Sequence, residues 1–162
     1  MNREDKERRF VRAVRERRGG MYRVAVSMLR SAQDAEDAVS AAVEAAWEHL
    51  DRVRDVDALP SYLMRCTVNA CRRALRRRKR ETPVEDMAPL MLQSGDPTML
   101  WEYLGSLPER YRLPLILRYS EDMSVQEVAG ALGLTRSGAS SRIQRGLRIL
   151  KEQLNREVKG RE

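Results

Sequence analysis

The sequence has little of what catalytic and metal sites are built from. Its 162 residues include one histidine and two cysteines, too few for an ordinary zinc site. Cys66 and Cys71 are five residues apart on a predicted helix, beyond the reach of a disulfide. No glycine-rich phosphate loop follows a predicted strand. We therefore expect no catalytic residues, no metal, no cofactor and no enzymatic activity.

Long hydrophobic runs are also missing. No apolar stretch approaches the roughly 20 residues of a membrane-spanning helix, and no apolar segment of a secretory signal follows the N-terminus. These absences predict a cytoplasmic protein without membrane insertion. Charge is plentiful instead: charged residues make up 34% of the chain, and the net charge is +7. A basic balance of this size favours a polyanionic partner such as a nucleic acid.

The charge is divided among three parts of the chain. Residues 1–80 and 98–162 are both basic, whereas 81–97 contain four acidic side chains and no lysine or arginine. The acidic segment also contains prolines, which argue against a continuous helix. The pattern predicts an N-terminal domain over 1–80 and a C-terminal domain over 98–162, joined by a flexible acidic linker at 81–97.

The apolar residues of the N-terminal domain recur at helical spacing, and few segments alternate with period two. Gly19-Gly20 predicts the end of a first helix, and Ser31 is the expected N-cap of a third, whose apolar face includes Trp47. Four helices are expected in this domain: 4–18, 21–30, 31–50 and 60–80. The expected fold is all-α, with a helical bundle here and short helices in the C-terminal domain.

The C-terminal domain contains the pattern of a helix-turn-helix. Ser124 and Glu127 form a capping box at the start of one helix, and Gly133 marks a tight turn after it. A longer helix begins near Arg136 and continues past Leu154. A helix, a glycine-bearing turn and a longer second helix are typical of the helix-turn-helix motif.

The last helix divides into two faces at about 100° per residue. Its apolar face is expected to pack on the preceding helix and consists of Ala139, Ile143, Gly146, Leu147 and Leu150. Its polar face consists of Ser137, Ser140, Ser141, Gln144, Arg145 and Arg148, flanked by Arg136 and Arg142. Small hydroxyl residues at a helix N-terminus favour a bound phosphate, and glutamine and arginine read base edges in a major groove. A solvated surface is the alternative, but no acidic residue occurs between Glu127 and Glu152.

Two earlier helices also carry charge of one sign. The helix expected at 60–80 ends in a run of arginines and a lysine, which repel one another unless a polyanion neutralises them. Asn69 within it could hydrogen-bond a base edge or serve a structural role. The helix at 31–50 carries its acids on one face: Asp34, Asp37, Glu44 and Glu48. That face indicates either a docking surface for a basic protein partner or a solvated surface.

Together these motifs resemble those of the extracytoplasmic-function (ECF) sigma factors of bacteria. Residues 34–39, Asp-Ala-Glu-Asp-Ala-Val, resemble the family sequence D-A-E-D-L-V. Tyr62-Leu63, Asn69 and the arginines after it resemble the W-L…N…R helix. Residues 107–112 are similar to L-P-x-x-x-R, and 124–145 are similar to the family's helix-turn-helix.

The resemblance implies a sigma factor that binds core RNA polymerase, recognises the −35 and −10 promoter elements and stabilises melted DNA. It also implies promoter DNA and an anti-sigma factor as partners. The implied polymerase contacts are Asp34, Glu36, Asp37, Ser40 and Glu44. The implied −10 contacts are Tyr62, Arg65, Asn69, Arg72, Arg73 and Arg76. The implied −35 contacts are Arg136, Ser137, Ser140, Ser141, Arg142, Gln144, Arg145 and Arg148.

The chain departs from the family pattern at several of these positions. Ser40-Ala41 replace Gln-Glu, Tyr62 replaces Trp, and Arg73 replaces Asp. Residues 137–140 replace G-T-V-K, which removes a lysine and implies an atypical −35 preference.

Two other classes of protein share parts of the pattern. An autonomous helix-turn-helix transcription regulator would bind duplex DNA without polymerase, normally as a dimer on a palindrome. An interaction adaptor would use its basic helix only for non-specific binding of nucleic acid.

Overall fold

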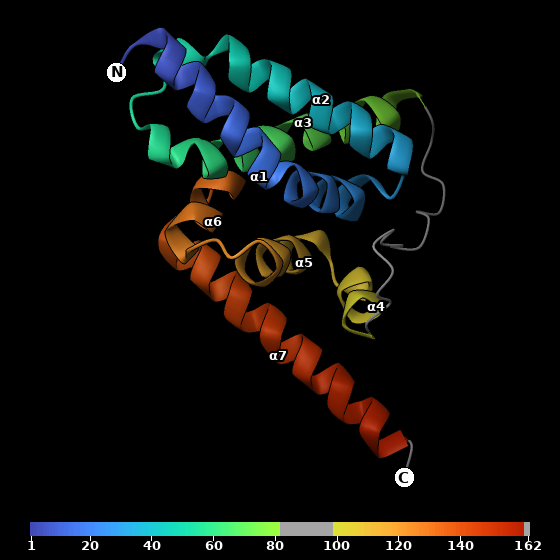
Figure 1. Ribbon diagram of the computed structural model, residues 1–162. Coiled ribbons are helices and arrows are strands. Elements are labelled where there is room, and N and C mark those ends of the chain that lie inside the picture. Colours follow the sequence, from blue (N-terminus) through green and yellow to red (C-terminus); the bar gives the residue numbers. More distant parts are fainter. Residues whose placement is uncertain (82–98, 161–162) are drawn as a thin grey trace. The chain divides into compact units, whose positions relative to one another are not determined.

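The computed structural model describes residues 1–81 and 99–160, and within these ranges all regular elements are helices. Helices α1–α3 form one compact unit and α4–α7 another (Figure 1). The predicted all-α fold of two helical domains is confirmed. Apart from Glu81, the acidic linker predicted at 81–97 lies outside the described residues. None of the described helices combines the length and apolar character of a membrane span.

Three long helices build the first unit, and each packs against the other two. They are α1 (Arg3–Leu29), α2 (Ala32–Glu48) and α3 (Leu59–Glu81), with short 3₁₀ turns at Leu50–Arg52 and Val56–Ala58. The buried stripe of α2 consists mainly of alanines, which allow close approach of the neighbouring helices. Larger side chains fill the centre: Met21, Val24, Met28, Leu63, Met64 and Val68.

The prediction that Gly19-Gly20 ends the first helix is wrong, because α1 continues through both glycines. A glycine inside a helix costs about 1 kcal/mol. Met21 and Val24, just beyond, are fully buried, and each such side chain contributes about 1.5–3 kcal/mol. Tertiary burial therefore outweighs the local stop signal. The helix ends instead at Leu29, and its C-cap Arg30 has a left-handed backbone (φ 52°).

The starts of the next two helices agree with the sequence. The Ser31 hydroxyl accepts the backbone N–H of Asp34 at 3.2 Å, so Ser31 is the N-cap of α2 as predicted. Pro60 lies in the first turn of α3, where its missing N–H costs no helical hydrogen bond. Trp47 differs from expectation, since it is 40% exposed. It lies about 120–135° around α2 from the centre of the alanine stripe, just outside the buried face.

The second unit contains the predicted helix-turn-helix. Its elements are α4 (Met99–Ser106), α5 (Glu109–Leu115), a π-helical turn (Ile116–Ser120), α6 (Val125–Leu132) and α7 (Arg136–Gly160). The capping box is present: the Ser124 hydroxyl accepts the Glu127 N–H, and the Glu127 carboxylate accepts the Ser124 N–H, both at 3.1 Å. Gly133 ends α6 with φ 69°, a left-handed conformation that favours glycine.

The last helix, α7, is longer than the surface that the neighbouring helices offer for packing. α5 and α6 pack against α7, and its C-terminal turns extend past them (Figure 1). Leu147 was expected to face the preceding helix but is 40% exposed. It lies about 60° from Leu150, at the edge of the apolar stripe, which explains the difference.

Candidate nucleic-acid interfaces

The N-terminus of α7 is held by a side-chain cap. The Thr135 hydroxyl accepts the backbone N–H of Gly138 at 3.0 Å. A Cβ atom on residue 138 would lie only 3.0 Å from the same hydroxyl, so the glycine leaves room for the cap. The cap occupies one of the backbone N–H donors of the first turn, which is then not free to bind a phosphate.

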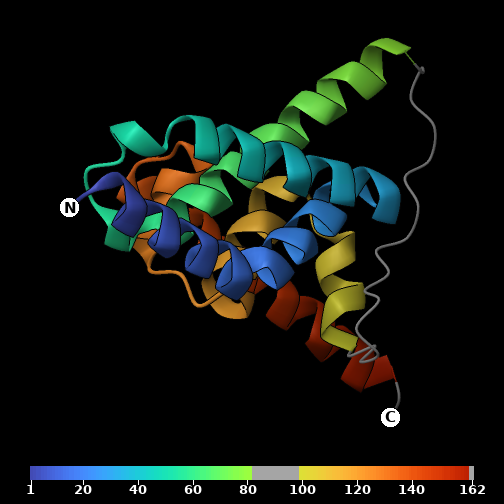
Figure 2. The same cartoon turned by 45° about the horizontal axis from the view of Figure 1, so that its top comes forward.

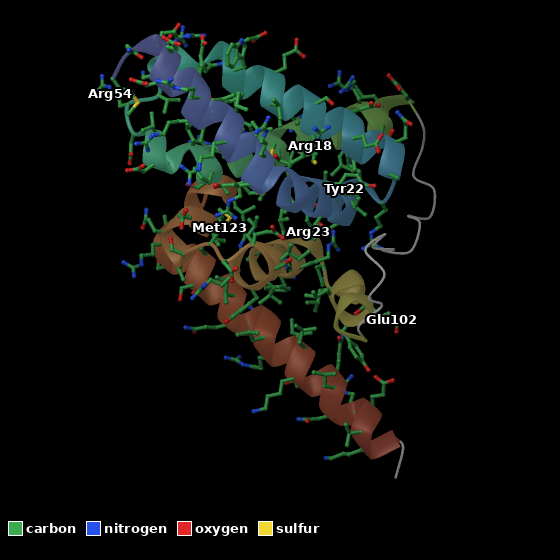
Figure 3. All side chains as sticks on the ribbon, in the orientation of Figure 1. Arg18, Tyr22, Arg23, Arg54, Glu102 and Met123 are labelled. Atoms are coloured by element: carbon green, nitrogen blue, oxygen red, sulfur yellow. The ribbon has the colours of Figure 1, made fainter. Side chains whose placement is uncertain are left out.

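The two faces of α7 separate as the sequence predicted, apart from Leu147. Ala139, Ile143, Gly146 and Leu150 are buried. Six predicted −35 residues are exposed: Arg136, Ser137, Ser141, Gln144, Arg145 and Arg148. Ser140 and Arg142 are partly exposed. Nitrogen-tipped side chains project along most of the helix (Figure 3). Six of these eight residues thus share one face of α7 that is rich in hydrogen-bond donors, and Arg136 and Arg142 lie on its two flanks.

The back of α7 lies unusually close to α5. A Cβ atom on Gly146 would lie 3.0 Å from Leu115 Cδ1 and 3.4 Å from the Cβ of Tyr111. The exposed Arg145 is the neighbour of this contact, and its guanidinium lies 5.9 Å from the Tyr111 ring. Sequence analysis did not single out Tyr111, because it is a variable position of the L-P-x-x-x-R motif. Its contact depends on how α5 and α7 pack.

The six predicted −10 residues share one face of α3. At about 100° per residue they fall within an arc of roughly 100°. Arg65, Asn69, Arg73 and Arg76 are exposed, while Tyr62 and Arg72 are partly exposed. The opposite face is buried in the bundle. Figure 2 shows the C-terminal turns of α3 extending past α1 and α2, and most residues there are exposed.

Tyr62 lies against Cys66, one turn along the same helix. Burial is the main cause that raises the pKa of Tyr62, and contact with Cys66 adds to it. Burial also raises the pKa of the Cys66 thiol, although the hydrogen bond to Tyr62 partly opposes this. Both groups are therefore neutral near pH 7. Tyr62 presents an uncharged aromatic ring beside Asn69 and the arginines, which is the combination that single-strand binding surfaces use.

Arg78 does not belong to this surface, although it lies within the arginine run. It falls about 160° around α3 from Tyr62. Its guanidinium donates to the Leu29 carbonyl at 3.0 Å and to the Asp34 carboxylate at 2.6 Å. Arg78 thus ties the end of α1 and the start of α2 to α3. Asp34, a predicted polymerase contact, already has this partner inside the bundle.

The other predicted polymerase contacts lie on the outer face of α2. Glu36, Asp37, Ser40 and Glu44 are all exposed. Ser40 and Glu44 also line an apolar groove between α1 and α2 that sequence analysis missed. The remaining lining residues are Phe10, Val14, Arg18, Val39, Val43 and Trp47. The Phe10 and Trp47 rings meet edge to face at 5.3 Å. In the sequence, only the large aromatic side chain of Trp47, at the border of the apolar face of its helix, pointed to this groove.

The described residues include no cluster of three or more histidine, cysteine, aspartate or glutamate side chains that could hold a metal ion. The fold and these surfaces define a class, a two-domain helical DNA-binding protein with a helix-turn-helix. Residues 13–81 match the model of Sigma-70 region 2, and residues 98–150 match that of Sigma-70 region 4. The two matches cover about three quarters of the chain. The chain belongs to the sigma-70 family, in its ECF group, and is a sigma factor that directs RNA polymerase to promoters.

Curated relatives match along almost the whole chain. RNA polymerase sigma factor SigV of Bacillus subtilis is 28% identical over 153 residues, which span 91% of this chain and 92% of SigV. RNA polymerase sigma-E factor of Streptomyces avermitilis is 29% identical over 151 residues, 90% of this chain and 84% of that protein. These relatives do not favour the autonomous regulator considered above.

Two solved structures share the fold. The sigma factor RpoE, in complex with the anti-sigma factor NepR from Bartonella quintana, has a TM-score of 0.78 at 21% identity, covering 90% of this chain and 96% of RpoE. CnrH, in complex with the cytosolic domain of CnrY, has a TM-score of 0.66 at 24% identity, covering 92% of this chain and 89% of CnrH.

Proposed function

We propose that α7 reads the −35 element and that its eight polar residues make the contacts. The observation that carries this proposal is the division of α7 into a buried apolar face and an exposed face without an acidic residue. Arg145 and Gln144 are long enough to reach base edges in the major groove. Arg136, Arg142 and Arg148 neutralise phosphates, while the small serines allow the helix to approach the backbone closely.

The exposed face of α3 captures the −10 element once its strands separate. Asn69 hydrogen-bonds an unpaired base, and Tyr62 offers a ring for stacking. The four arginines of this face hold the backbone of the same strand: Arg65, Arg72, Arg73 and Arg76. The shared arc of these six side chains supports this assignment, because one strand can then contact all of them.

The outer face of α2 docks on core RNA polymerase. Its exposed acids fit a basic patch, and the groove beside Ser40 and Glu44 offers an apolar surface for a partner side chain. Asp34 contributes less than its position in the motif implies, since its charge is already compensated by Arg78.

The same division of labour assigns polymerase and −10 binding to residues 1–80 and −35 binding to residues 98–162, with 81–97 as the connection. The polymerase supplies the chemistry, and this chain acts in the cytoplasm as a non-catalytic initiation factor. An anti-sigma factor holds it inactive by covering the polymerase-binding surface. The co-crystal structure of RpoE with the anti-sigma factor NepR supports this last point.

Run-off transcription tests the proposal. Purified core polymerase is assayed with and without this protein on genomic fragments, and promoter-specific transcripts are expected only when the protein is present. Arg145→Ala should reduce transcription from promoters that depend on their −35 element and leave polymerase binding intact. Arg156→Ala, an exposed arginine on the distal part of α7, is the matched control. DNA binding without initiation, or loss of polymerase binding in Arg145→Ala, contradicts the proposal.

A further inference from the structure

Tyr111 brings two arginines from different elements onto one aromatic ring. The guanidinium carbon of Arg110, its neighbour in α5, lies 4.9 Å from the ring centroid, and that of Arg145 in α7 lies 5.9 Å away. Both distances fall within the roughly 6 Å over which a cation is attracted to a ring face. Tyr111 itself is only 8% exposed, whereas both arginines are exposed.

The ring is a fixed platform because the backbone beneath it is tightly packed. Gly146 lets α7 approach α5 so closely that a Cβ atom there would lie 3.4 Å from the Cβ of Tyr111 and 3.0 Å from Leu115. Arg145, the residue before Gly146, is therefore presented from a backbone position packed close to Tyr111. Its side chain has many rotamers, whose freedom a ring contact reduces.

Contact with the Tyr111 ring is the restraint available to orient Arg145. Within the described residues, no carboxylate pairs with the guanidinium of Arg110 or Arg145. An arginine reads guanine through two parallel hydrogen bonds, which require a defined plane of the guanidinium. A ring face restricts that plane before DNA arrives, so less side-chain freedom is lost on binding.

We propose that Tyr111 is a positioning residue for promoter recognition: its ring holds Arg145 in the orientation that reads one base pair of the −35 element. The inference rests on the proposed function of α7 and deepens it. Tyr111 touches no base itself. Its effect appears as discrimination at the base pair that Arg145 contacts, and at no other.

The test uses the full chain in complex with core polymerase, on a promoter that gives run-off transcripts. Every base pair of the −35 element is substituted singly, and the loss of transcription is measured for wild type and variants. Arg145→Ala first identifies the base pair whose substitution no longer matters. If no such base pair exists, the assignment of Arg145 as a base reader fails, whatever Tyr111 does.

Tyr111→Leu keeps an apolar side chain and removes the ring. We expect discrimination at the Arg145 base pair to fall about two- to fivefold, the range of an exposed cation–ring contact, and to stay unchanged elsewhere. Tyr111→Phe keeps the ring and should behave as wild type. In the Arg145→Ala background, Tyr111→Leu should have no further effect, because the side chain that it orients is gone.

Tyr119→Leu is the matched control. The guanidinium carbon of Arg118 lies 5.6 Å from the centroid of the Tyr119 ring in the same unit, but Tyr119 is 55% exposed. Its substitution should leave −35 discrimination unchanged. A uniform loss at all base pairs in Tyr111→Leu, or an equal loss with and without Arg145, would assign Tyr111 to packing alone and overturn the proposal. Should Tyr111→Leu fail to unfold cooperatively, Tyr111→Met replaces it in the same measurements.

Discussion

Arg78 and Arg76 are neighbours in the arginine run of α3, and the structure assigns them opposite roles. Arg78→Ala should destabilise the first unit and leave DNA binding nearly unchanged. Arg76→Ala should do the reverse, because Arg76 is exposed on the face shared by Tyr62 and Asn69.

The magnitude follows from the two contacts of Arg78. The hydrogen bond to the Leu29 carbonyl is worth about 1 kcal/mol. The pair with Asp34 joins side chains that are 36% and 47% exposed, so solvent screening reduces it to about 0.2–1 kcal/mol. The expected loss is about 1–2 kcal/mol, or roughly 4–16 °C in Tm for a domain of this size. About 1 M salt should screen the ion pair and leave the carbonyl bond.

Urea unfolding followed by tryptophan fluorescence measures this loss. In a Trp101→Phe background, Trp47 in α2 is the only tryptophan and reports on the first unit alone. Binding to single-stranded −10 DNA is measured over a range of salt concentrations, where Arg76→Ala should lower the salt slope by about 0.7. An equal loss of stability in the two variants, or no loss in Arg78→Ala, would refute the reasoning.

Three further predictions concern individual positions. Ser124→Ala removes one half of the capping box and should cost about 1 kcal/mol, measured as a lower Tm of the second unit; an unchanged Tm would show that water replaces the cap. Gly133→Ala places a Cβ in open space, so its expected cost of about 1–2 kcal/mol comes from the positive φ alone, and Gly130→Ala, also in open space within α6, should instead be neutral or stabilising. Burial raises the pKa of the Cys66 thiol, so its contribution to stability is present below about pH 8.5, where a thiol in the unfolded chain begins to ionise, and is lost as the pH rises further. The free energy of unfolding, measured with urea, should therefore fall less between pH 7.5 and pH 9.5 in Cys66→Ala than in wild type. An equal fall in the two proteins would contradict this account.

Local chemistry explains why much of the architecture could be predicted. Ser31, the Ser124–Glu127 pair and Gly133 act on the backbone within four residues of themselves, so their effect is readable without knowledge of the fold. The faces of α7 and α3 follow from helical periodicity in the same way. The assignment of those faces to −35 and −10 DNA came from the family resemblance, and it stays a prediction.

The features that were missed depend on contacts between distant parts of the chain. Gly19-Gly20 carries a strong local stop signal, which the burial of Met21 and Val24 overrides. Periodicity could have placed Arg78 opposite Asn69, but its partners at the ends of α1 and α2 come from packing. Tyr111 likewise gains the contact with Arg145 only when α5 meets α7.

The glycine at position 146 also has a practical consequence. It anchors α7 through the side of the helix that touches no DNA in the proposed arrangement, while the residues offered to the promoter stand on the other side. Exchanging Gln144 for another polar residue should therefore redirect promoter choice at little expense in folding. Variants of α7 could therefore be exchanged to build transcription systems that do not initiate at the promoters of their host.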